Sequence, residues 1–302
     1  MLEADHLITF ATVAKLESLS LAAEHLYKSQ PAISNQLKRL QEAVGEPLYT
    51  RHRYGIRLTS TGEALLPFAQ TLTRTLEAAR HYVHELRVGQ TGQLSIAAST
   101  TIAMYYLPKQ LKLFQEEMPG IELRLITCNT QEAVHLLTEG SADLALIEGP
   151  LQNSRLEQRQ IAQDEIMLAV LPEHPFAGKK VLQLAELNGL EVVRRESGSG
   201  TRAVVDAVLN PAGIRPKTVL EAKGVDAVKE AVLQGFGAAF LSKLALEREV
   251  SMGLLKALRI DKGLIRPLSM VHAGLELCSQ TTRSFIQFLE TNQQRIEAQP
   301  SE

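Results

Sequence analysis

Three short helix patterns joined by tight links occupy the first part of the chain, and this spacing restricts the N-terminal fold more than any other feature. Apolar residues recur at helical intervals over residues 7–14 and again over residues 21–26. Ser29 can cap a third helix, which has Pro31 in its first turn, where a missing N–H costs little, and Gly45 as its stop. Two short helices with a tight link between them are typical of a helix-turn-helix, whose second helix enters the major groove of DNA.

The third predicted helix has a polar outer face. Its buried stripe is expected to consist of Ile33, Leu37, Leu40 and Val44. The residues that remain outside this stripe are Gln30, Pro31, Ser34, Asn35 and Lys38. Glutamine and asparagine amides can pair bidentately with adenine edges, and lysine or serine can reach bases or phosphates. We therefore expect this face to contact DNA.

A basic segment follows the same helix. Residues 28–57 contain six basic side chains against two acidic ones, although the whole chain has a formal net charge of -2. Residues 48–51 and 57–58 are predicted to form the two short strands of a wing that carries Arg51 and Arg53. Helix-turn-helix patterns also occur in bundles that bind nothing, but this local charge lies where phosphates would lie, which favours DNA binding.

A long helix is predicted after the wing, over residues 60–88. Ser60-Thr61-Gly62-Glu63 has the form of a capping box that opens it. Apolar residues then alternate four and three apart, as in a two-stranded coiled coil, at Leu65, Ala69, Leu72, Leu76, Ala79, Val83 and Leu86. We expect this seam to dimerise the chain, and the alternative is a helix that packs on its own domain. Residues 89–92 are expected to form a hinge.

Strand and helix patterns alternate from residue 93 onward, which predicts a mostly parallel sheet with helices on both faces. The expected strands cover residues 94–98, 121–127, 144–147, 167–171, 190–194, 218–222, 238–241 and 269–273. The expected helices cover residues 104–117, 131–139 and 281–292, and two more begin at Thr201 and Asp226. The elements form two series, so we predict two α/β lobes, with the last strand and helix returning to the first lobe.

Polar residues at the ends of strands are candidate ligand contacts, because ligands bind beyond the carboxyl ends of strands, where helix N-termini offer free N–H groups. The candidates are Ser99, Thr100, Thr101, Asn129, Glu148, Ser197, Gly198, Ser199, Gly200, Thr201 and Arg202. The glycines can let N–H groups converge on an anion. We therefore expect a cleft between the lobes that binds a small carboxylate, phosphate or sulfur oxyanion.

Structural alternatives stay open for several of these residues. Ser99 and Thr101 can simply cap a helix, and the loop over residues 197–202 can be an ordinary turn. Arg202 can be an anion clamp or a solvated helix residue. Glu148 would repel an anion unless it is paired.

Three segments resemble the LysR-type transcriptional regulators, namely Ser18–Leu26, Ser29–Ser34 and Leu58–Gly62. The resemblance implies base contacts from Gln30, Pro31, Ser34 and Asn35, and phosphate contacts from Ser29, Lys38 and Arg51. It further implies a sensor domain of the type-II periplasmic-binding-protein fold and a tetramer built as a dimer of dimers. This chain departs from the residues common in the family at Gln41, Tyr49 and Asn35. The last departure leaves the operator sequence open.

The sequence therefore predicts an α/β chain with an N-terminal, mostly helical DNA-binding domain and a C-terminal two-lobed sensor. The expected parts are a winged helix-turn-helix over residues 1–59, a dimerising linker helix over 60–88, and an effector-binding domain over 93–302, with lobe I at 93–161 and 267–302 and lobe II at 162–266. The predicted function is a ligand-responsive transcription regulator, in which a small anionic metabolite alters the DNA-bound homotetramer. RNA polymerase is a further candidate partner, beside operator DNA and a second copy of the chain.

Other classes of protein fit the sequence less well. The chain has no apolar run of about 18 residues and no secretory signal, so we expect a cytoplasmic protein that does not contact a membrane. Cys128 and Cys278 are the only cysteines and lack metal-ligand spacing, so we expect no metal site, disulfide or cofactor. The loop around Ser199 lacks the full Gly-x-Ser-x-Gly elbow, which argues against a hydrolytic enzyme.

Two non-enzymatic alternatives also remain. A solute-binding protein could use the same cleft, but it would require export. A nucleoid-type protein that binds DNA without an effector is the second alternative. Stabilisation of the chain by one metabolite would argue against this alternative.

Overall fold

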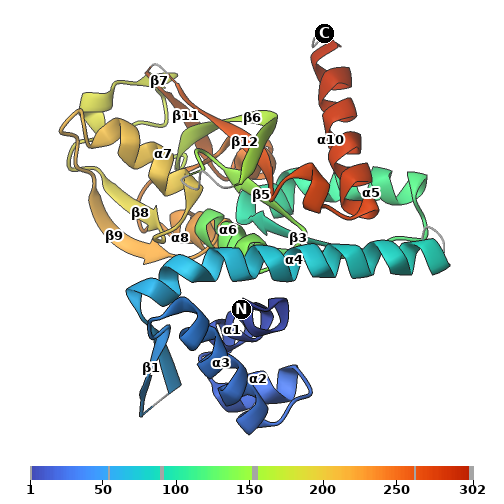
Figure 1. The fold of residues 1–302 in the computed structure, drawn as a ribbon. Coiled ribbons are helices and arrows are strands. Elements are labelled where there is room, and N and C mark those ends of the chain that lie inside the picture. The colour runs from blue at the N-terminus through green and yellow to red at the C-terminus, as the bar shows by residue number, and fades with distance from the viewer. Residues whose placement is uncertain (1, 54, 89–91, 152–155, 262, 299–302) are drawn as a thin grey trace. The chain divides into compact units, whose positions relative to one another are not determined.

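The computed structural model describes residues 2–53, 55–88, 92–151, 156–261 and 263–298, while the side chains of residues 78, 81, 82, 84–88 and 294–298 lie outside the description. Internal contacts divide the chain into two compact units, residues 1–89 with 138–140 and residues 90–137 with 141–302. Figure 1 shows the helical elements that begin the first unit and the mixed sheet with its helices in the second.

The N-terminal unit is a winged helix-turn-helix followed by a long helix, as predicted. Its elements are α1 (Ala4–Leu16), α2 (Leu19–His25), α3 (Gln30–Val44), β1 (Tyr49–His52), β2 (Gly55–Leu58) and α4 (Ser60–Val88). The hydroxyls of Ser18 and Ser29 cap α2 and α3, and Gly45 ends α3 in the left-handed conformation at φ 84°. The core is formed by Phe10, Val13, Ala22, Ile33, Leu37, Leu40 and Leu48.

The wing is a two-stranded antiparallel hairpin held against the helices. The N–H of Ile56 donates to the carbonyl of Glu17 at 3.0 Å, which ties β2 to the end of α1. A Cβ on Gly62 would come within 2.0 Å of the Leu48 carbonyl oxygen. Only glycine therefore lets the first turn of α4 lie this close to the wing, which fixes the wing's position beside α3.

Helix α4 has the predicted bounds, but Ser60 is its first helical residue and not its cap. Thr59 takes the capping position. Its hydroxyl accepts from the N–H of Gly62 at 3.1 Å and donates to the carbonyl of Pro47 at 2.7 Å. The cap thus also joins the helix to the segment between α3 and β1.

The first turns of α4 pack on the core of their own unit. Leu65 and Leu72 are partly buried and Ala69 is fully buried against that core, whereas Leu76 and Val83 are 38% and 46% exposed. The first half of the predicted coiled-coil seam therefore follows the alternative interpretation, packing on its own domain. Ala79 is exposed, and the Leu86 side chain lies outside the described residues.

The C-terminal unit is a mixed α/β domain. Its strands are β3 (Gln93–Ser99), β4 (Glu122–Cys128), β5 (Leu144–Glu148), β6 (Glu157–Val170), β7 (Val181–Leu182), β8 (Glu191–Arg195), β9 (Lys217–Ala222), β10 (Ala239–Ser242), β11 (Lys256–Ile260) and β12 (Leu264–His272). Its α-helices are α5 (Leu107–Glu117), α6 (Thr130–Thr138), α7 (Gly200–Leu209), α8 (Val225–Leu233), α9 (Lys243–Ser251) and α10 (Gln280–Ala298), and a π-helical segment, η1 (Ile102–Tyr106), precedes α5. Every predicted strand and helix is present, and β7, β11 and α9 were not predicted.

Two long antiparallel strands, β6 and β12, join the lobes. The sheet order is β4-β3-β5-β12-β6-β11-β7, with β10 also paired to β6. The parallel strands β3, β4 and β5 form lobe I with α5, α6 and α10, while β8 to β11 and α7 to α9 form lobe II. The prediction of a mostly parallel sheet is therefore wrong at its centre, where the chain crosses to lobe II and returns. Each lobe has buried apolar clusters of its own.

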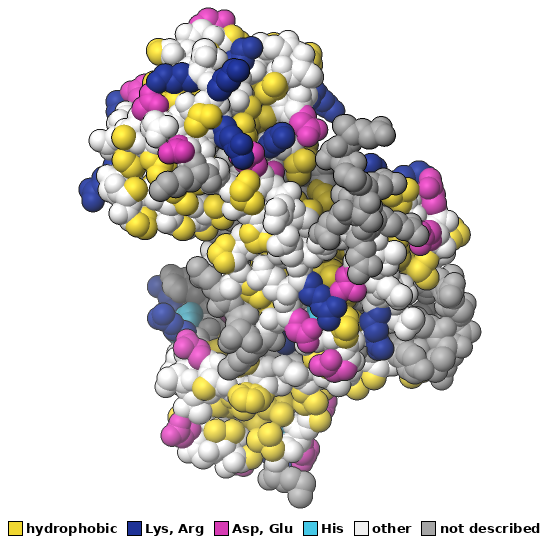
Figure 2. Space-filling model, turned by 90° about the horizontal axis from the view of Figure 1, so that it is seen from above, with side chains coloured by type: hydrophobic (Ala, Val, Ile, Leu, Met, Phe, Trp, Pro, Cys, Tyr) yellow, Lys and Arg dark blue, Asp and Glu magenta, His cyan; other side chains and the backbone are white. Residues whose placement is uncertain are grey.

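Charges of both signs are interspersed on the face of the molecule that Figure 2 shows. Figure 2 shows basic and acidic side chains next to one another on one face, in keeping with the formal net charge of -2. Within the described residues, no helix combines the length and apolar character that crossing a membrane requires.

Candidate DNA-binding face and ligand cleft

Helix α3 presents its predicted polar face to solvent. Ser29, Gln30, Pro31, Asn35 and Lys38 are exposed, and Ser34 is partly buried. Within the described chain, the side chains of Gln30 and Asn35 have no hydrogen-bond partner. Their amides are therefore available to pair with base edges.

The wing places a guanidinium beside this face. Nη2 of Arg51 donates to the hydroxyl of Ser34 at 3.2 Å, and Arg53 is exposed on the same hairpin. Lys28, by contrast, donates to Asp5 at 2.7 Å. This hydrogen bond holds the pKa of the Asp5 carboxyl below its usual value. The cation of Lys28 is thus partly neutralised, and Arg51 is the better placed phosphate contact.

Replacing Arg51 with alanine should weaken binding to specific and random duplexes by the same factor. One phosphate contact fewer should reduce the slope of log K against log salt by about 0.9. Fluorescence anisotropy titrations at several salt concentrations would measure this slope. Lys112→Ala serves as the control, because Lys112 is an exposed cation on α5 with a single carboxylate neighbour, Glu116. An unchanged slope in the Arg51 variant would remove that residue from the phosphate contacts.

A buried cluster of charges lies where the crossing strands pass between the lobes. Arg266 on β12 is fully buried, and its Nε donates to Asp164 on β6 at 2.8 Å. Its Nη1 donates to the carboxylate of Glu148 and, at 2.7 Å, to the hydroxyl of Thr201 at the start of α7. Ser99 donates to Glu148 at 2.8 Å. The cluster therefore connects β5 of lobe I with α7 of lobe II.

Glu148 is paired rather than free in the cleft. Burial alone would raise its pKa, but the guanidiniums of Arg266 and Arg195 and the hydrogen bonds from Ser99 and Thr101 hold the pKa below its usual value. The carboxylate is ionised at neutral pH. The sequence left open whether Glu148 is paired. The structure shows that it is, so its negative charge is compensated and need not repel an anion.

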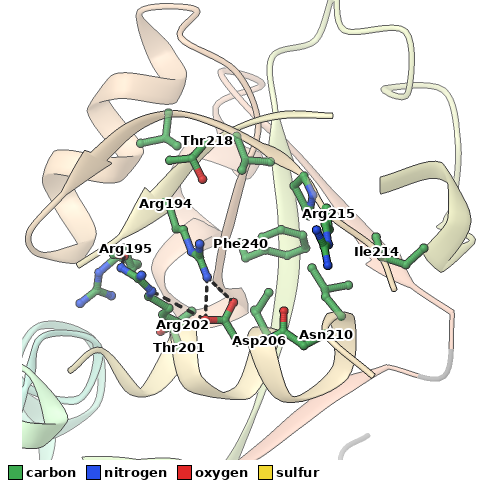
Figure 3. Close-up of a pocket in the computed structure, with 15 residues that line it drawn as sticks. Arg194, Arg195, Thr201, Arg202, Asp206, Asn210, Ile214, Arg215, Thr218 and Phe240 are labelled. Atoms are coloured by element: carbon green, nitrogen blue, oxygen red, sulfur yellow. Dashed lines mark hydrogen bonds and ion pairs between the residues drawn. The ribbon is translucent and has the colours of Figure 1, made fainter. Parts of the chain in front are cut away.

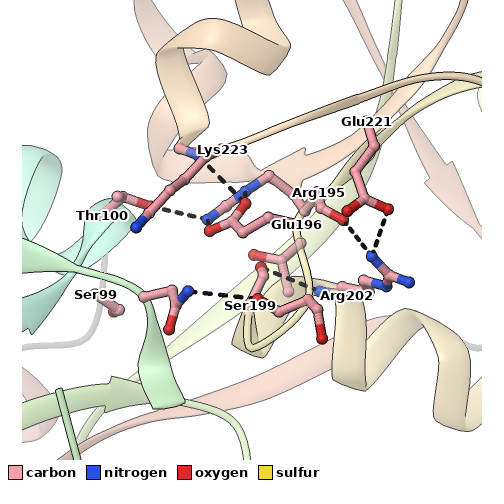
Figure 4. A network of polar contacts seen from close by, with 12 residues as sticks. Ser99, Thr100, Arg195, Glu196, Ser199, Arg202, Glu221 and Lys223 are labelled. Carbon is pink, nitrogen blue, oxygen red and sulfur yellow. Dashed lines mark hydrogen bonds and ion pairs between the residues drawn. The ribbon is translucent and has the colours of Figure 1, made fainter. Parts of the chain in front are cut away.

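Arg195, at the end of β8, reaches from lobe II to lobe I (Figure 4). Its Nη2 donates to the Thr100 hydroxyl at 3.2 Å, while Nε and Nη2 hold Glu196 at 2.8 and 3.0 Å. The side chain is only 4% exposed. Among the described residues, Nη1 has no hydrogen-bond partner. A buried N–H without a partner is costly, so this nitrogen is a candidate donor to an oxygen of a ligand.

The loop before α7 lies very close to lobe I. The N–H of Gln131 donates to the carbonyl of Gly198 at 3.2 Å. A Cβ on Gly200 would come within 2.2 Å of the carbonyl oxygen of Glu148. The close approach of the two lobes therefore explains why residues without a side chain stand at these positions. A cavity of about 550 Å³ beside the loop is lined by Thr130, Gln131, Val134, Glu148, Pro150, Leu151, Ser197, Gly198, Ser199, Gly200, Arg202, Ala203 and Asp206.

The other polar residues of this region are bonded within the protein. Ser199 caps α7, since its hydroxyl accepts from the N–H of Arg202 at 3.4 Å. The guanidinium of Arg202 donates to Glu221 at 2.8 Å. Asn129 donates through Nδ2 to the carbonyl of Ser197 at 3.4 Å. Capping and contact between the lobes thus account for the hydrogen bonds that these residues make.

Sequence reasoning missed the two arginines that organise the cleft. Arg195 directly precedes the loop that was singled out, and its buried position on β8 could not be read from the pattern. Arg266 gave one signal, a charge within an otherwise apolar run beside Ile265. The predicted strand began only at residue 269, whereas β12 begins at Leu264.

The two cysteines are buried and free. Burial raises the pKa of both Cys128 and Cys278 to about 11, so both thiols are protonated at neutral pH and poorly nucleophilic. In the described part of the chain, no group of three or more histidine, cysteine or carboxylate side chains is arranged to hold a metal ion.

A reading helix with a basic wing and a two-lobed α/β domain with polar groups at the lobe boundary define a DNA-binding regulator that carries a ligand-sensing domain. Residues 4–63 match the family described as bacterial regulatory helix-turn-helix protein, lysR family, and residues 87–294 match the LysR substrate binding domain. The chain belongs to the LysR family of ligand-responsive transcriptional regulators.

Individual relatives agree with this assignment. The chain is 33% identical over 291 residues to the HTH-type transcriptional regulator CysL of Bacillus subtilis, covering 96% of this chain and 97% of CysL. The CcmR regulatory domain of Synechocystis, solved in complex with 2-PG, is 27% identical with a TM-score of 0.63, covering 67% of this chain and 97% of that domain. Full-length OxyR of Pseudomonas aeruginosa is 19% identical with a TM-score of 0.73, and the match covers 97% of this chain and 95% of OxyR. At that identity OxyR shares the fold alone.

Proposed function

We propose that this LysR-family regulator controls transcription in response to a small organic anion that binds at the lobe boundary, beside Arg195 and Thr100. The observation that carries the proposal is the buried guanidinium of Arg195, whose Nη1 has no partner in the described protein. A hydrogen bond from this nitrogen to an ionised oxygen is about twice as strong as a neutral one. The hydroxyl of Thr100, 3.2 Å from Nη2, offers a second contact on lobe I.

Contacts between the lobes offer a route for the response. Besides Arg195 and Thr100, the Tyr105 hydroxyl donates to Asp226 at 2.7 Å, and Lys223 donates to Glu132 at 2.7 Å. An anion that enters the cleft changes which of these contacts is favourable. It shifts the arrangement of the lobes only if it binds the two arrangements with different affinities.

The remaining parts of the proposal concern assembly and location. The exposed Leu76 and Val83 on α4 are proposed to pair with a second copy of the chain, with two dimers forming a homotetramer on operator DNA. We propose a cytoplasmic regulator without catalytic activity, with RNA polymerase as a candidate partner. Residues 1–59, 60–88 and 93–302 are proposed as its functional divisions.

Replacing Arg195 with glutamine should raise the Kd of the effector by about tenfold to a hundredfold, the value of a lost charge-assisted hydrogen bond. Titration calorimetry of the full chain would measure this with 2-PG, chosen because the related CcmR domain was solved with it. A panel of small carboxylates, phosphates and sulfur oxyanions would follow.

Arg248→Gln is the matched control, because Arg248 is an exposed arginine on α9 outside the cleft. Binding to random duplex should stay unchanged in both variants. If no anion in the panel binds, or if the Arg195 variant binds the anion as well as the parent protein does, the proposed site is wrong.

A further inference from the structure

A second cavity lies inside lobe II, between α7 and strands β8 and β9 (Figure 3). Its volume is about 360 Å³. Its apolar wall is made of Val192, Val205, Leu209, Ile214 and Phe240. All five belong to or pack on the apolar core of lobe II, so the cavity is an opening into that core rather than a surface dimple. Small-molecule sites commonly have a volume of about 300–1,000 Å³ and an apolar wall. Here polar and charged side chains make up most of the rest of the lining.

Three of the four guanidiniums that line the cavity already have carboxylate partners. Arg195 pairs with Glu196 at 2.8 Å. Arg194 donates to both oxygens of Asp206 at 2.7 and 2.6 Å. Arg202 donates to Glu221 at 2.8 Å and lies 3.7 Å from Asp206. These charges compensate one another, so they do not by themselves call for a ligand.

Arg215 differs from the other three arginines. Among the described residues, its guanidinium has neither a hydrogen bond nor an ion pair. In Figure 3, Phe240 lies between Arg194 and Arg215, and the Arg215 side chain extends toward the cavity. The cavity lining therefore contains an exposed guanidinium whose charge no described carboxylate compensates, together with the aromatic ring of Phe240.

We propose that this cavity is a second ligand site, separate from the cleft between the lobes, and that it takes a small monoanion with an aromatic or branched apolar body. The carboxylate or other anionic group pairs with Arg215, where a planar guanidinium can bind it bidentately. The apolar body lies against Phe240 and Val205, which offer an aromatic contact and a place to bury apolar surface. A purely polar anion would leave the apolar wall of the cavity uncovered. A neutral ligand would leave the guanidinium of Arg215 without an anionic partner.

The position of the cavity gives its occupant a route to the first site. Thr201 lines the cavity, and its hydroxyl donates to Glu148 at 3.1 Å. Arg195 also lines it and contacts Thr100 of lobe I. An occupant that shifts α7 changes both contacts, so the two ligands should alter each other's affinity by the same factor. This coupling rests on the proposed function of the cleft, whereas binding in the cavity does not.

Phenylacetate and its neutral isostere phenylacetamide are the probes, titrated into the full chain by calorimetry and by methyl NMR. Phenylacetate should bind and shift the methyl signals of Val205, Leu209 and Ile214. Arg215→Gln should raise the Kd of phenylacetate by about tenfold, which is about 1.4 kcal/mol. The same variant should leave the weaker binding of phenylacetamide unchanged. Thr218→Phe fills the cavity from its exposed edge on β9 and should abolish binding of both probes.

Arg248→Gln, which removes an exposed arginine of α9 remote from the cavity lining, should bind both probes like the parent protein. Circular dichroism melting would confirm that each variant is folded. Three results would overturn the site: no phenylacetate binding up to about 10 mM, equal affinity in the Arg215 and Arg248 variants, or methyl shifts that leave out Val205, Leu209 and Ile214. None of these measurements depends on Arg195, so a failed effector site in the cleft leaves this test intact.

Discussion

Replacing Arg266 with leucine should lower the free energy of unfolding of the C-terminal unit by about 3–5 kcal/mol. Arg266 is fully buried, and its guanidinium compensates two buried carboxylates, Glu148 and Asp164. Leucine fills much of the space but removes the cation that is bonded to both carboxylates, and only the charge of Arg195 then remains near Glu148. The cost of an uncompensated buried charge, rather than the strength of the ion pair, is what the variant measures. Urea unfolding followed by circular dichroism would give the free energy.

Arg259→Leu is the matched control for this variant. Arg259 on β11 pairs with Glu165 at 2.7 Å, but its side chain is 57% exposed. Loss of such a solvated pair should cost at most about 1 kcal/mol. Equal losses in the two variants would show that burial does not govern the contribution of Arg266.

Arg266→Leu should also reverse the pH dependence that Glu148 gives to the free energy of unfolding. In the parent protein the pKa of Glu148 is lowered, so its stabilising contribution is present above the unfolded pKa of about 4.3 and is lost as the pH falls through the folded value. Without Arg266, only Arg195 and the hydrogen bonds from Ser99 and Thr101 oppose the effect of burial, so the pKa of Glu148 should rise. The penalty then grows as the pH rises above about 4.3, so the gap between the parent and the variant should narrow on acidification. A gap that stays constant from neutral pH to about pH 4.5 would contradict this assignment.

Replacing Gln30 and Asn35 together with alanine should cost about 2–6 kcal/mol of operator binding and little of the binding to random duplex. Each lost bidentate base contact accounts for about 1–3 kcal/mol, and roughly additive contributions are expected. Both side chains are exposed and have no hydrogen-bond partner in the described protein, so the variant should fold normally. An operator selected from a random duplex pool, with anisotropy titrations against operator and random DNA, would measure both affinities.

The Arg51→Ala variant is the contrasting control for this experiment. It should weaken both duplexes alike, because phosphate contacts carry no sequence information. If the double amide variant also weakens both duplexes alike, α3 positions the protein on DNA without reading the bases through these residues.

The N-terminal unit was predictable almost residue by residue. Ser29 caps the start of α3 and Gly45 ends the helix, as the sequence pattern predicted. The polar face that contains Gln30 and Asn35 is exposed as predicted. Helix caps, turns and amphipathic periodicity act over a few neighbouring residues, so a linear pattern records them fully. The cap of α4 was displaced to Thr59 because the decisive partner, Pro47, lies in the preceding segment.

The linker helix shows where periodicity ceases to be decisive. The spacing of Leu65, Ala69, Leu72 and Leu76 predicts that one face of the helix is buried. It does not indicate whether that face packs on its own unit or on a second chain. The structure buries the first three residues on their own unit and leaves Leu76 exposed.

The sequence by itself therefore determined the helix-turn-helix, the wing, the alternation that builds two lobes, and most of the polar residues at the lobe boundary. Only the tertiary structure decided what those polar residues do. Arg266 meets Glu148 across 118 positions of sequence, and Arg195 meets Thr100 across 95. Pairing between such distant residues depends on how whole strands cross and pack, and a buried charge is tolerated only where that packing supplies its partner. Neither condition leaves a local pattern in the chain.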